Sequence, residues 1–251
     1  MIMKKMMILN FFKTNTNSID KIDEILFSDI TKVSFINDYF LPRVPLVIKN
    51  GAKNWPLIKL WTKEYISNHN GDYICTVISD SRPAHSKLKT TLANYFNVHK
   101  DKSTLTLDFD PKKSPFFLKG LKFPNIYFSK NNIHRFFFYH SVRDAGTLPH
   151  VHRDAFNILR EGEKRWVMFD ADRTISPKGY SLMMKTNKKY PPGTHSKDWF
   201  KKDYFKLSKK VDKVFECIQS PEDIIFIPIN YCHTVVNTSD EVLGLVDEVL
   251  R

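Results

Sequence analysis

Residues 146–154, with the sequence Gly-Thr-Leu-Pro-His-Val-His-Arg-Asp, decide how this chain is expected to fold. Successive side chains of a β-strand point to opposite faces, so one face of a strand over Leu148–Asp154 would carry two histidines and an aspartate. These are His150, His152 and Asp154. Imidazole and carboxylate groups spaced in this way form half of a site for a borderline metal such as iron. The simpler alternative is a strand whose polar side chains face solvent.

A second histidine motif lies far along the chain, in Pro228-Ile229-Asn230-Tyr231-Cys232-His233. A metal site that begins on one strand needs a further ligand from a distant strand, and we expect His233 to supply it. With both motifs present in one chain, a metal site is favoured over a solvent-facing strand.

From Arg135 onward the sequence consists of short apolar runs separated by turn residues, which indicates a series of β-strands. Many short strands without helices between them argue for a sandwich or barrel, of which the jelly roll is one member. Glu161-Gly162-Glu163 has the composition of a hairpin turn between two of these strands. The predicted strands are Arg135–Tyr139, Leu148–Asp154, Phe156–Arg160, Lys164–Phe169, Phe215–Gln219, Ile224–Ile227, Thr234–Val236 and Val242–Val246.

The part of the chain before residue 135 is expected to mix helices with strands and to pack on the β-rich core. Residues 1–18 look like a loose leader, 19–134 form the mixed part, and 135–251 form the core, with a basic surface insertion at about 174–213. The predicted helices are one capped by Ser18 or Asp20 and ending at Phe27, and those over Ser34–Phe40, Ile58–His69 and Ser86–Phe96. The predicted strands are Leu46–Ile48, Tyr73–Ser79 and Thr104–Phe109.

The composition is that of a folded protein from a reducing compartment. With 251 residues, 42% of them hydrophobic and 14% aromatic, the chain can bury a full core, which excludes a disordered protein. A net charge of +12 permits acidic partners such as nucleic acid, although a lysine-rich solvated surface is the simpler explanation. Three cysteines without a Cys-x-x-Cys pair argue against a disulfide framework. No cleavage site follows the basic start and no apolar stretch reaches the ~18 residues of a membrane span, so we expect a cytoplasmic or nucleocytoplasmic protein.

Three segments resemble the Jumonji C, or cupin-like, oxygenases in sequence and in order. GTLPHVHRDAFNILREGEKRWVMF (146–169) resembles the first metal-binding stretch of that family, and FECIQSPEDIIFIPINYCHTVVNTSDEVLGL (215–245) resembles the second. FLPRVPLVIKNGAKNWPLIKLWTKEYI (40–66) resembles the segment that precedes them. The resemblance covers roughly residues 20–250, apart from the insertion. It implies a double-stranded β-helix, a jelly-roll or cupin-like barrel, that uses Fe(II), 2-oxoglutarate as cosubstrate and O2.

The resemblance leaves two registers open for the first half of the metal site. The family usually has His-x-Asp, with a threonine three residues before the histidine and an asparagine several residues after it. Thr147 and Asn157 match those positions if His150 is the first ligand, which puts a histidine where the carboxylate usually stands. Alternatively, the pair is His152 with Asp154, which restores the carboxylate. The favoured ligand set is His150, His152 and His233, with Asp154 orienting an imidazole.

The resemblance also implies a pocket for 2-oxoglutarate. Lys164, in Gly162-Glu163-Lys164, matches the family's lysine, whose ammonium forms a charge-assisted bond with the distal carboxylate. On sequence alone, a lone strand lysine would be expected to face solvent. Where relatives place a tyrosine on the cosubstrate this chain has Phe117, so Tyr139 is expected to substitute. The other expected pocket residues are Thr147, Asn157 and Asn237.

The leading hypothesis from the sequence is a dioxygenase that hydroxylates a side chain of a polypeptide, with no catalytic residue beyond the metal and cosubstrate sites. A tRNA-base hydroxylase is an alternative that the basic surface would suit, with RNA as the partner. A catalytically inactive cupin-like binding module is a second alternative, favoured by His152 and Phe117 at altered positions. We expect no membrane partner. We also expect a monomer, because the sequence ends just after the last predicted strand, without the C-terminal helices that some relatives use to dimerise.

Overall fold

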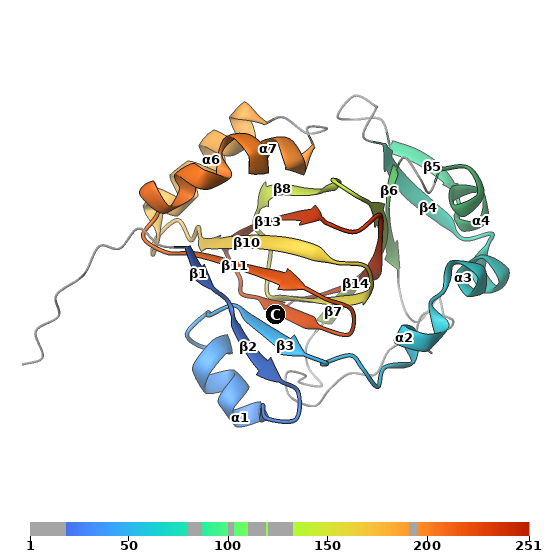
Figure 1. Cartoon of the computed structure of the whole chain (residues 1–251), viewed down its shortest axis with the longest axis horizontal. Helices are drawn as coiled ribbons and strands as arrows, with labels where there is room; N and C mark the ends of the chain where they lie inside the picture. Colours follow the sequence, from blue (N-terminus) through green and yellow to red (C-terminus); the bar gives the residue numbers. More distant parts are fainter. Residues whose placement is uncertain are drawn as a thin grey trace, which may run out of the picture.

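The computed structural model describes residues 19–79, 87–99, 103–109, 119, 133–190 and 195–250. The predicted leader at 1–18, and Phe117 with the stretch around it, lie outside these residues. Two β-sheets form the centre of the molecule, and helices lie around them (Figure 1). The fold is therefore mainly β, as the sequence predicted.

Strands that follow one another in the chain often belong to different sheets. The order in the five-stranded sheet is β1 (Ile19–Lys21), β11 (Val214–Gln219), β10 (Lys164–Asp170), β13 (Tyr231–Asn237) and β8 (Gly146–His150). The order in the nine-stranded sheet is β2 (Asp23–Leu26), β3 (Leu46–Lys49), β12 (Ile224–Ile227), β9 (Ala155–Glu161), β14 (Glu241–Leu250), β7 (Ile133–Val142), β6 (Ser103–Phe109), β4 (Ile74–Ser79) and β5 (Lys87–Thr91). From β8 to β14 the chain crosses repeatedly between the sheets, so residues far apart in sequence meet at the centre.

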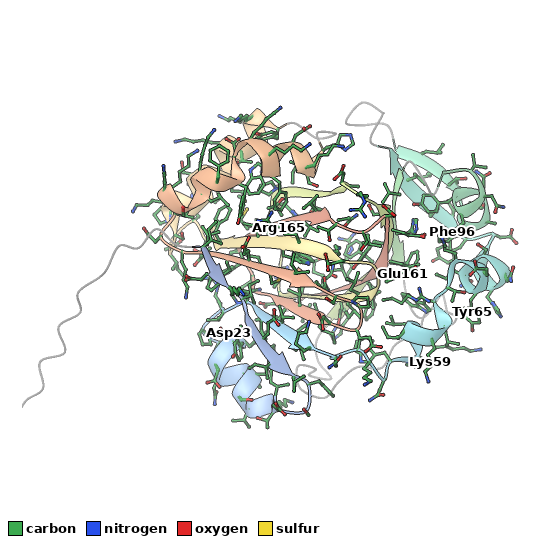
Figure 2. All side chains as sticks on the ribbon, in the orientation of Figure 1. Asp23, Lys59, Tyr65, Phe96, Glu161 and Arg165 are labelled. Atoms are coloured by element: carbon green, nitrogen blue, oxygen red, sulfur yellow. The ribbon has the colours of Figure 1, made fainter. Side chains whose placement is uncertain are left out.

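Alternation along the strands gives each sheet an inner and an outer face. In β12, Ile225 belongs to the cluster between the sheets, whereas Phe226 belongs to the core on the outer side of the nine-stranded sheet. In β10, Trp166 faces inward and Val167 faces outward. Side chains from both sheets therefore pack against one another in part of the space between them (Figure 2).

Short helices of the N-terminal half cover the outer face of the nine-stranded sheet. Trp61 lies against Phe138 with ring centroids 5.5 Å apart, and Phe35 lies against Phe226 at 5.1 Å. Full burial of one such phenylalanine contributes about 1.5–3 kcal/mol, so these contacts hold the layer in place. The elements are α1 (Lys32–Ser34), the π-helical η1 (Phe35–Phe40), α2 (Pro56–Leu60), α3 (Lys63–Asn70), α4 (Leu92–Asn94) and the π-helical η2 (Tyr95–His99).

A separate helical layer, between β10 and β11 in the chain, covers the outer face of the five-stranded sheet. Met183, Trp199 and Leu207 form one buried cluster there with Val167 and Phe169. The layer consists of α6 (Pro177–Lys189), α7 (Ser196–Lys202) and the 3-10 helix η3 (Tyr204–Lys209). Figure 1 shows α6 and α7 well separated from α1 to α4, which lie around the other side of the sheets.

Three helix predictions need correction, because strand pairing and local caps override helical propensity. The helix predicted to end at Phe27 is replaced by β1 and β2, which run parallel to β11 and β3. The first half of the helix predicted over Ser86–Phe96 is β5, which pairs with β4. The helix predicted over Ile58–His69 is interrupted at Trp61, and α3 begins after Thr62, whose side chain caps its first turn.

Two predictions around the histidine motif are also wrong. Glu161-Gly162-Glu163 is not a hairpin turn, because β9 pairs with β12 and β14 whereas β10 pairs with β11 and β13. The turn carries the chain from one sheet to the other, with Gly162 at a φ of 85° and no room for a Cβ, which would lie 2.1 Å from the Glu241 carbonyl oxygen. The strand predicted over Leu148–Asp154 is β8, and it ends at His150.

The remaining predicted strands are confirmed, although β7, β13 and β14 are longer than expected. The predicted helix Ser34–Phe40 is confirmed as the helical segment made by the end of α1 and η1. Among the described helices, none combines the length and the apolar character that crossing a bilayer requires.

A chain of polar groups ties α3 to the nine-stranded sheet. The Tyr95 hydroxyl lies 2.7 Å from Nδ1 of the buried His140, and His140 Nε2 contacts the carboxylate of Glu241. Lys63 Nζ donates to the other oxygen of that carboxylate at 2.7 Å. The hydrogen bond from His140 lowers the pKa of Glu241 most, and the hydrogen bond from Lys63 lowers it further. Burial opposes both effects, and the resulting pKa is about 2.

We expect Glu241→Gln to destabilise the protein at neutral pH and to matter less in acid. An unfolded glutamate has a pKa of about 4.3. The stabilisation from the folded carboxylate is therefore full above that value and is lost as the pH falls toward about 2. Free energies of unfolding in urea, for both proteins between neutral pH and about pH 3, measure the difference. Asp212→Asn removes a carboxylate that is 86% exposed and serves as the control. A wild-type advantage that does not shrink in acid would contradict the charged network.

Candidate metal centre

Three histidines converge where β8 meets β13. The antiparallel pairing of these strands places His233 beside His150, and His152 follows shortly after the end of β8. The potential ligand atoms of the three side chains lie within 4.8 Å of one another, and the ring centroids of His150 and His233 are 4.1 Å apart. The two histidine motifs, distant in sequence, thus meet in space.

Main-chain carbonyl groups fix the tautomer of all three rings. Nδ1 of each ring lies within hydrogen-bond distance of a carbonyl oxygen, at 2.8 Å for His150, 2.6 Å for His152 and 3.0 Å for His233. A carbonyl oxygen only accepts, so Nδ1 carries the proton and Nε2 keeps its lone pair. Metal-binding histidines are commonly supported in this way by a partner of the second nitrogen.

Burial keeps two of these imidazoles neutral. Burial, and then the proximity of His152, lower the pKa of His150 to about 4. Burial, followed by the two neighbouring histidines, holds the pKa of His233 well below its ordinary value. Neutral imidazole is the form that binds a divalent transition metal, so these donors are ready at neutral pH. The donor set fits a borderline ion such as iron(II).

Asp154 lies outside this group of three. Only 1% of the residue is exposed, and Oδ1 accepts a hydrogen bond from the main-chain N–H of Ile229 at 2.9 Å. Its main-chain oxygen accepts from the N–H of Val249 at 2.8 Å. Asp154 therefore ties the loop before β13 to β14 and steadies the strand that carries His233. Because the chain leaves β8 after His150, strict alternation does not bring Asp154 to the face of the histidines.

The three histidines line a cavity of about 420 Å³ between the two sheets. This volume is typical of a pocket for a small molecule. The five residues predicted to bind the cosubstrate also line it, from strands of both sheets: Thr147, Asn157, Lys164, Asn237 and Tyr139. The structure thus brings the predicted metal and cosubstrate residues, apart from Asp154, around one space.

Lys164 is a buried cation in this cavity. It is the first residue of β10, shares the inner face with Trp166 and is only 7% exposed. Nζ lies 4.0 Å from the centroid of the Tyr139 ring, and no carboxylate in the described part of the chain pairs with it. Burial lowers the pKa of this ammonium to about 7. A buried cation without a counter-charge is unfavourable, and an anionic ligand would compensate it.

Tyr139 and Asn157 form a buried polar pair in the cavity wall. Tyr139 Oη donates to Asn157 Oδ1 at 2.8 Å, and burial raises the pKa of the phenol, which therefore stays protonated. Gly244 makes room for this hydroxyl, since a Cβ there would lie 2.5 Å from Oη. Asn237 Nδ2 donates to the carbonyl oxygen of Val142 at 2.9 Å. Hydrogen bonds within the protein thus fix these side chains of the polar wall.

Several cavity residues are missing from the sequence-based prediction. Arg135, Phe137 and Ser141 line the cavity from β7, and Glu248 lines it from β14. The first three could have been predicted, because every second side chain of β7 shares a face with Tyr139. Glu248 belongs to no motif, and only the pairing of β14 with β7 brings it to the cavity.

The chain has relatives among characterised proteins, although no protein-family model matches it. It is 26% identical over 243 residues to psr-1 of Caenorhabditis elegans, a bifunctional arginine demethylase and lysyl-hydroxylase, and this match covers 87% of the chain and 58% of that protein. It is 24% identical over 243 residues to JMJ22 of Arabidopsis thaliana, an arginine-specific demethylase, with 85% of the chain and 43% of that protein covered. The chain spans about half the length of these curated relatives.

The relatives agree in their names, which are those of arginine demethylases, and psr-1 is also named a lysyl-hydroxylase. A third match, to psr-1 of Caenorhabditis briggsae, is 25% identical over 244 residues and covers 87% of the chain and 59% of that protein. These relatives confirm the resemblance to the Jumonji C family that the sequence predicted.

We expect Lys164→Met to stabilise the free protein at neutral and acidic pH. An unfolded lysine has a pKa of about 10.4. The penalty for the buried ammonium is therefore absent at strongly alkaline pH, grows as the pH falls, and is complete below about 7. The expected gain at pH 7 and below is on the order of a few kcal/mol.

Urea unfolding at neutral and at alkaline pH measures this gain. Lys188→Met removes an exposed lysine of α6 and serves as the matched control. A Lys164→Met protein that is less stable than the wild type at neutral pH would show that the ammonium has a stabilising partner.

Proposed function

We propose that this chain is an Fe(II)- and 2-oxoglutarate-dependent dioxygenase on a double-stranded β-helix, acting as a hydroxylase on a side chain of a polypeptide. The proposal rests on a cluster of three histidines and the ammonium of Lys164 in one cavity, where no carboxylate of the described residues pairs with that ammonium. The histidines offer nitrogen lone pairs, which suit a divalent ion. The ammonium offers a positive charge, which suits a carboxylate of a dicarboxylate ligand. Relatives named as a lysyl-hydroxylase and arginine demethylases support the same class.

In this proposal His150, His152 and His233 hold the iron. Three neutral ligands leave both charges of the ion uncompensated, unlike the common set of two histidines and one carboxylate. The ion and the Lys164 ammonium together would make the cavity strongly cationic, which favours a dianionic cosubstrate. Asp154 acts as a positioning residue through its bond to the loop before β13.

The polar wall of the cavity would bind 2-oxoglutarate. Lys164 would form the charge-assisted bond with the distal carboxylate, because its ammonium has no competing carboxylate among the described residues. Tyr139 and Asn157 hold each other in place and present polar atoms beside it. Thr147 and Asn237 complete the polar lining.

The remaining wall would exclude water from the reaction. When bound, the iron and 2-oxoglutarate supply the oxidation of a C–H bond by O2, and the protein supplies binding, orientation and a dry environment. Trp166, Ile227 and Val235 give the cavity an apolar wall. That wall would keep water away from the substrate carbon.

A polypeptide substrate is favoured over a tRNA base, because the relatives are named for reactions at arginine or lysine. The second candidate is a catalytically inactive cupin-like binding module. The observation that favours it is His152, which occupies the place of the usual carboxylate in the motif and lies in the histidine cluster.

We expect His233→Ala to abolish retention of iron, because it removes the ligand that β13 supplies. His152→Ala is expected to lose most of the iron, whereas folded Asp154→Ala retains it. Metal analysis of anaerobically loaded proteins measures the content, with His69→Ala, an exposed histidine of α3, as control. Full iron content in His233→Ala would contradict the site. Loss in Asp154→Ala with retention in His152→Ala would select the register that uses the carboxylate.

Anaerobic addition of 2-oxoglutarate to the iron-loaded protein is expected to produce a weak visible charge-transfer band. Lys164→Met should retain iron and weaken 2-oxoglutarate binding by roughly tenfold or more. After addition of O2, mass spectrometry of lysine- and arginine-containing peptides should show a gain of one oxygen. A band without product or succinate would favour the inactive module, and product on tRNA alone would favour the base hydroxylase. Bound iron without a band would contradict the oxygenase.

A further inference from the structure

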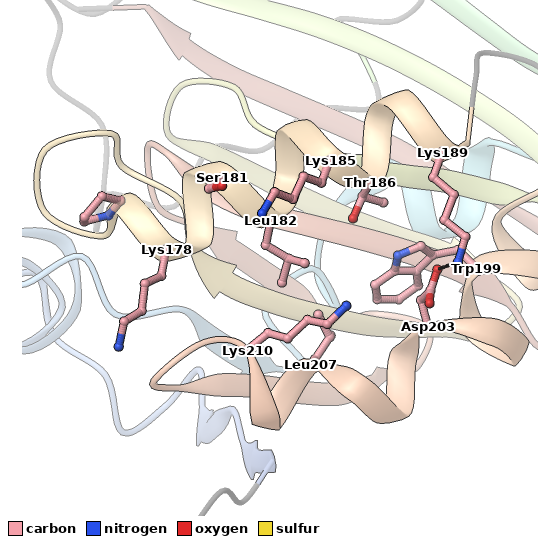
Figure 3. A pocket seen from close by; sticks show the side chains of 11 residues that line it. Lys178, Ser181, Leu182, Lys185, Thr186, Lys189, Trp199, Asp203, Leu207 and Lys210 are labelled. Carbon is pink, nitrogen blue, oxygen red and sulfur yellow. Dashed lines mark hydrogen bonds and ion pairs between the residues drawn. The ribbon is translucent and has the colours of Figure 1, made fainter.

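A second hollow lies on the outside of the helical layer that covers the five-stranded sheet. It is a groove of about 630 Å³ between α6 on one side and α7 with η3 on the other (Figure 3). None of the residues that line it belongs to the cavity with the histidines. Because the helices pack on the outer face of the sheet and the cavity lies on its inner face, the groove is a separate site.

The groove has an apolar floor. Leu182 of α6 contributes a half-buried aliphatic side chain, with Thr186 nearby (Figure 3). Leu207 of η3 is only 2% exposed, so it supports the floor from beneath. Trp199 is 1% exposed, so it supports the floor without presenting a ring face to solvent. A floor of this kind suits one aliphatic side chain of a ligand.

The one aspartate among the groove's lining residues is already neutralised. Asp203 Oδ2 accepts from Lys189 Nζ at 2.5 Å and from Tyr190 Oη at 2.7 Å, and Oδ1 accepts from Lys206 Nζ at 3.1 Å. Although burial opposes the effect, these donors hold the pKa of Asp203 well below its ordinary value. Asp203 therefore links α6 to the start of η3, and its negative charge is compensated by donors within the protein.

Two lysines keep their charge available to a ligand. Lys185 of α6 and Lys210, the residue after η3, line the groove from opposite walls, and both are exposed. Neither pairs with a carboxylate in the part of the chain that the structure describes. Lys178 pairs with Asp212 at 3.3 Å, but both side chains are exposed and solvent screens the pair. The groove therefore combines an apolar floor with a positive rim.

We infer that this groove docks an acidic linear segment of a partner polypeptide. An aliphatic side chain of that segment would rest on Leu182, and flanking carboxylates would meet Lys185 and Lys210. The inference is independent of the chemistry proposed for the cavity, because the groove would hold its partner without iron or cosubstrate.

A nucleic acid is the other polyanion that lysines attract, and the groove suits it less well. Single-stranded nucleic acids are usually held by bases stacked on exposed aromatic rings. The aromatic side chain in the groove, Trp199, is buried, and the accessible apolar side chain of the floor, Leu182, is aliphatic. A leucine between carboxylates would use both the floor and the rim, whereas a phosphate backbone would use the rim alone.

Fluorescence polarisation tests the inference with a short labelled peptide of glutamates and aspartates around one leucine. We expect the double variant Lys185→Glu, Lys210→Glu to weaken binding by roughly tenfold or more, because two attractions become repulsions. The matched control is Lys188→Glu, Lys209→Glu, which makes the same change of net charge at neighbouring positions outside the groove. It should change the affinity by less than about threefold.

Two further measurements test whether the apolar floor contributes to binding and whether binding is independent of the histidine cavity. Leu182→Gln should weaken the leucine peptide and leave a matched peptide with serine in place of leucine unchanged. Chelation of iron should leave peptide binding unaltered.

Several results would overturn the inference. One is equal weakening in both double variants, which would reduce the effect to overall charge. Others are the absence of binding to the wild type, dependence of binding on iron, and tighter binding of a labelled single-stranded RNA that competes with the peptide. The last result would assign the groove to nucleic acid.

Discussion

The antiparallel pairing of β13 with β8 is the constraint on which the candidate site depends. It places His233 beside His150, and the regular register shifts immediately afterwards, between His233 and Val235. A slip of one residue in either strand would turn a histidine to the opposite face of the sheet. The outer face resists such a slip, because Cys232 and Phe169 are buried there in one apolar cluster with the helical layer. The geometry of the histidine cluster is therefore held in part by side chains on the opposite face of the sheet.

The inner face of the five-stranded sheet serves two purposes along the same strand. Met168 of β10 belongs to the apolar cluster that joins the sheets, whereas Lys164, four residues earlier, lines the cavity. Buried polar groups without full compensation oppose folding, and they persist where a site needs them. The low pKa of Lys164 and the ordered pair of Tyr139 and Asn157 have this character. Apolar packing elsewhere between the sheets offsets the unfavourable burial of these groups.

The residues of the site were more predictable from the sequence than the elements that carry them. His150 and His233 each stand in a local motif whose chemistry is visible without knowledge of the fold, whereas Lys164 was assigned to the pocket only through the family resemblance. The turn at Gly162 was misjudged because two adjacent strands in the chain enter different sheets, and no local pattern encodes a distant partner. β1 and β2 were missed for the same reason, since short edge strands exist only through their pairing with β11 and β3. Alternation along a strand predicted that Asp154 shares a face with the histidines. That prediction is wrong because β8 ends at His150.

The five-stranded sheet would keep the proposed docking groove and the proposed reaction site apart, because the two share no lining residues. Its two faces are chemically independent, because alternate side chains of β10 and β13 enter either the cavity or the helical layer. β8 is the edge strand of this sheet, α6 and α7 contact it, and it also carries His150. A partner held in the groove would therefore approach the histidines around one strand edge. Tethering at that range raises the effective concentration of the remainder of the partner at the cavity. A weak affinity in the groove would then suffice to select substrates. Selection requires only that one partner binds the groove longer than its competitors, without contact with the reacting atoms.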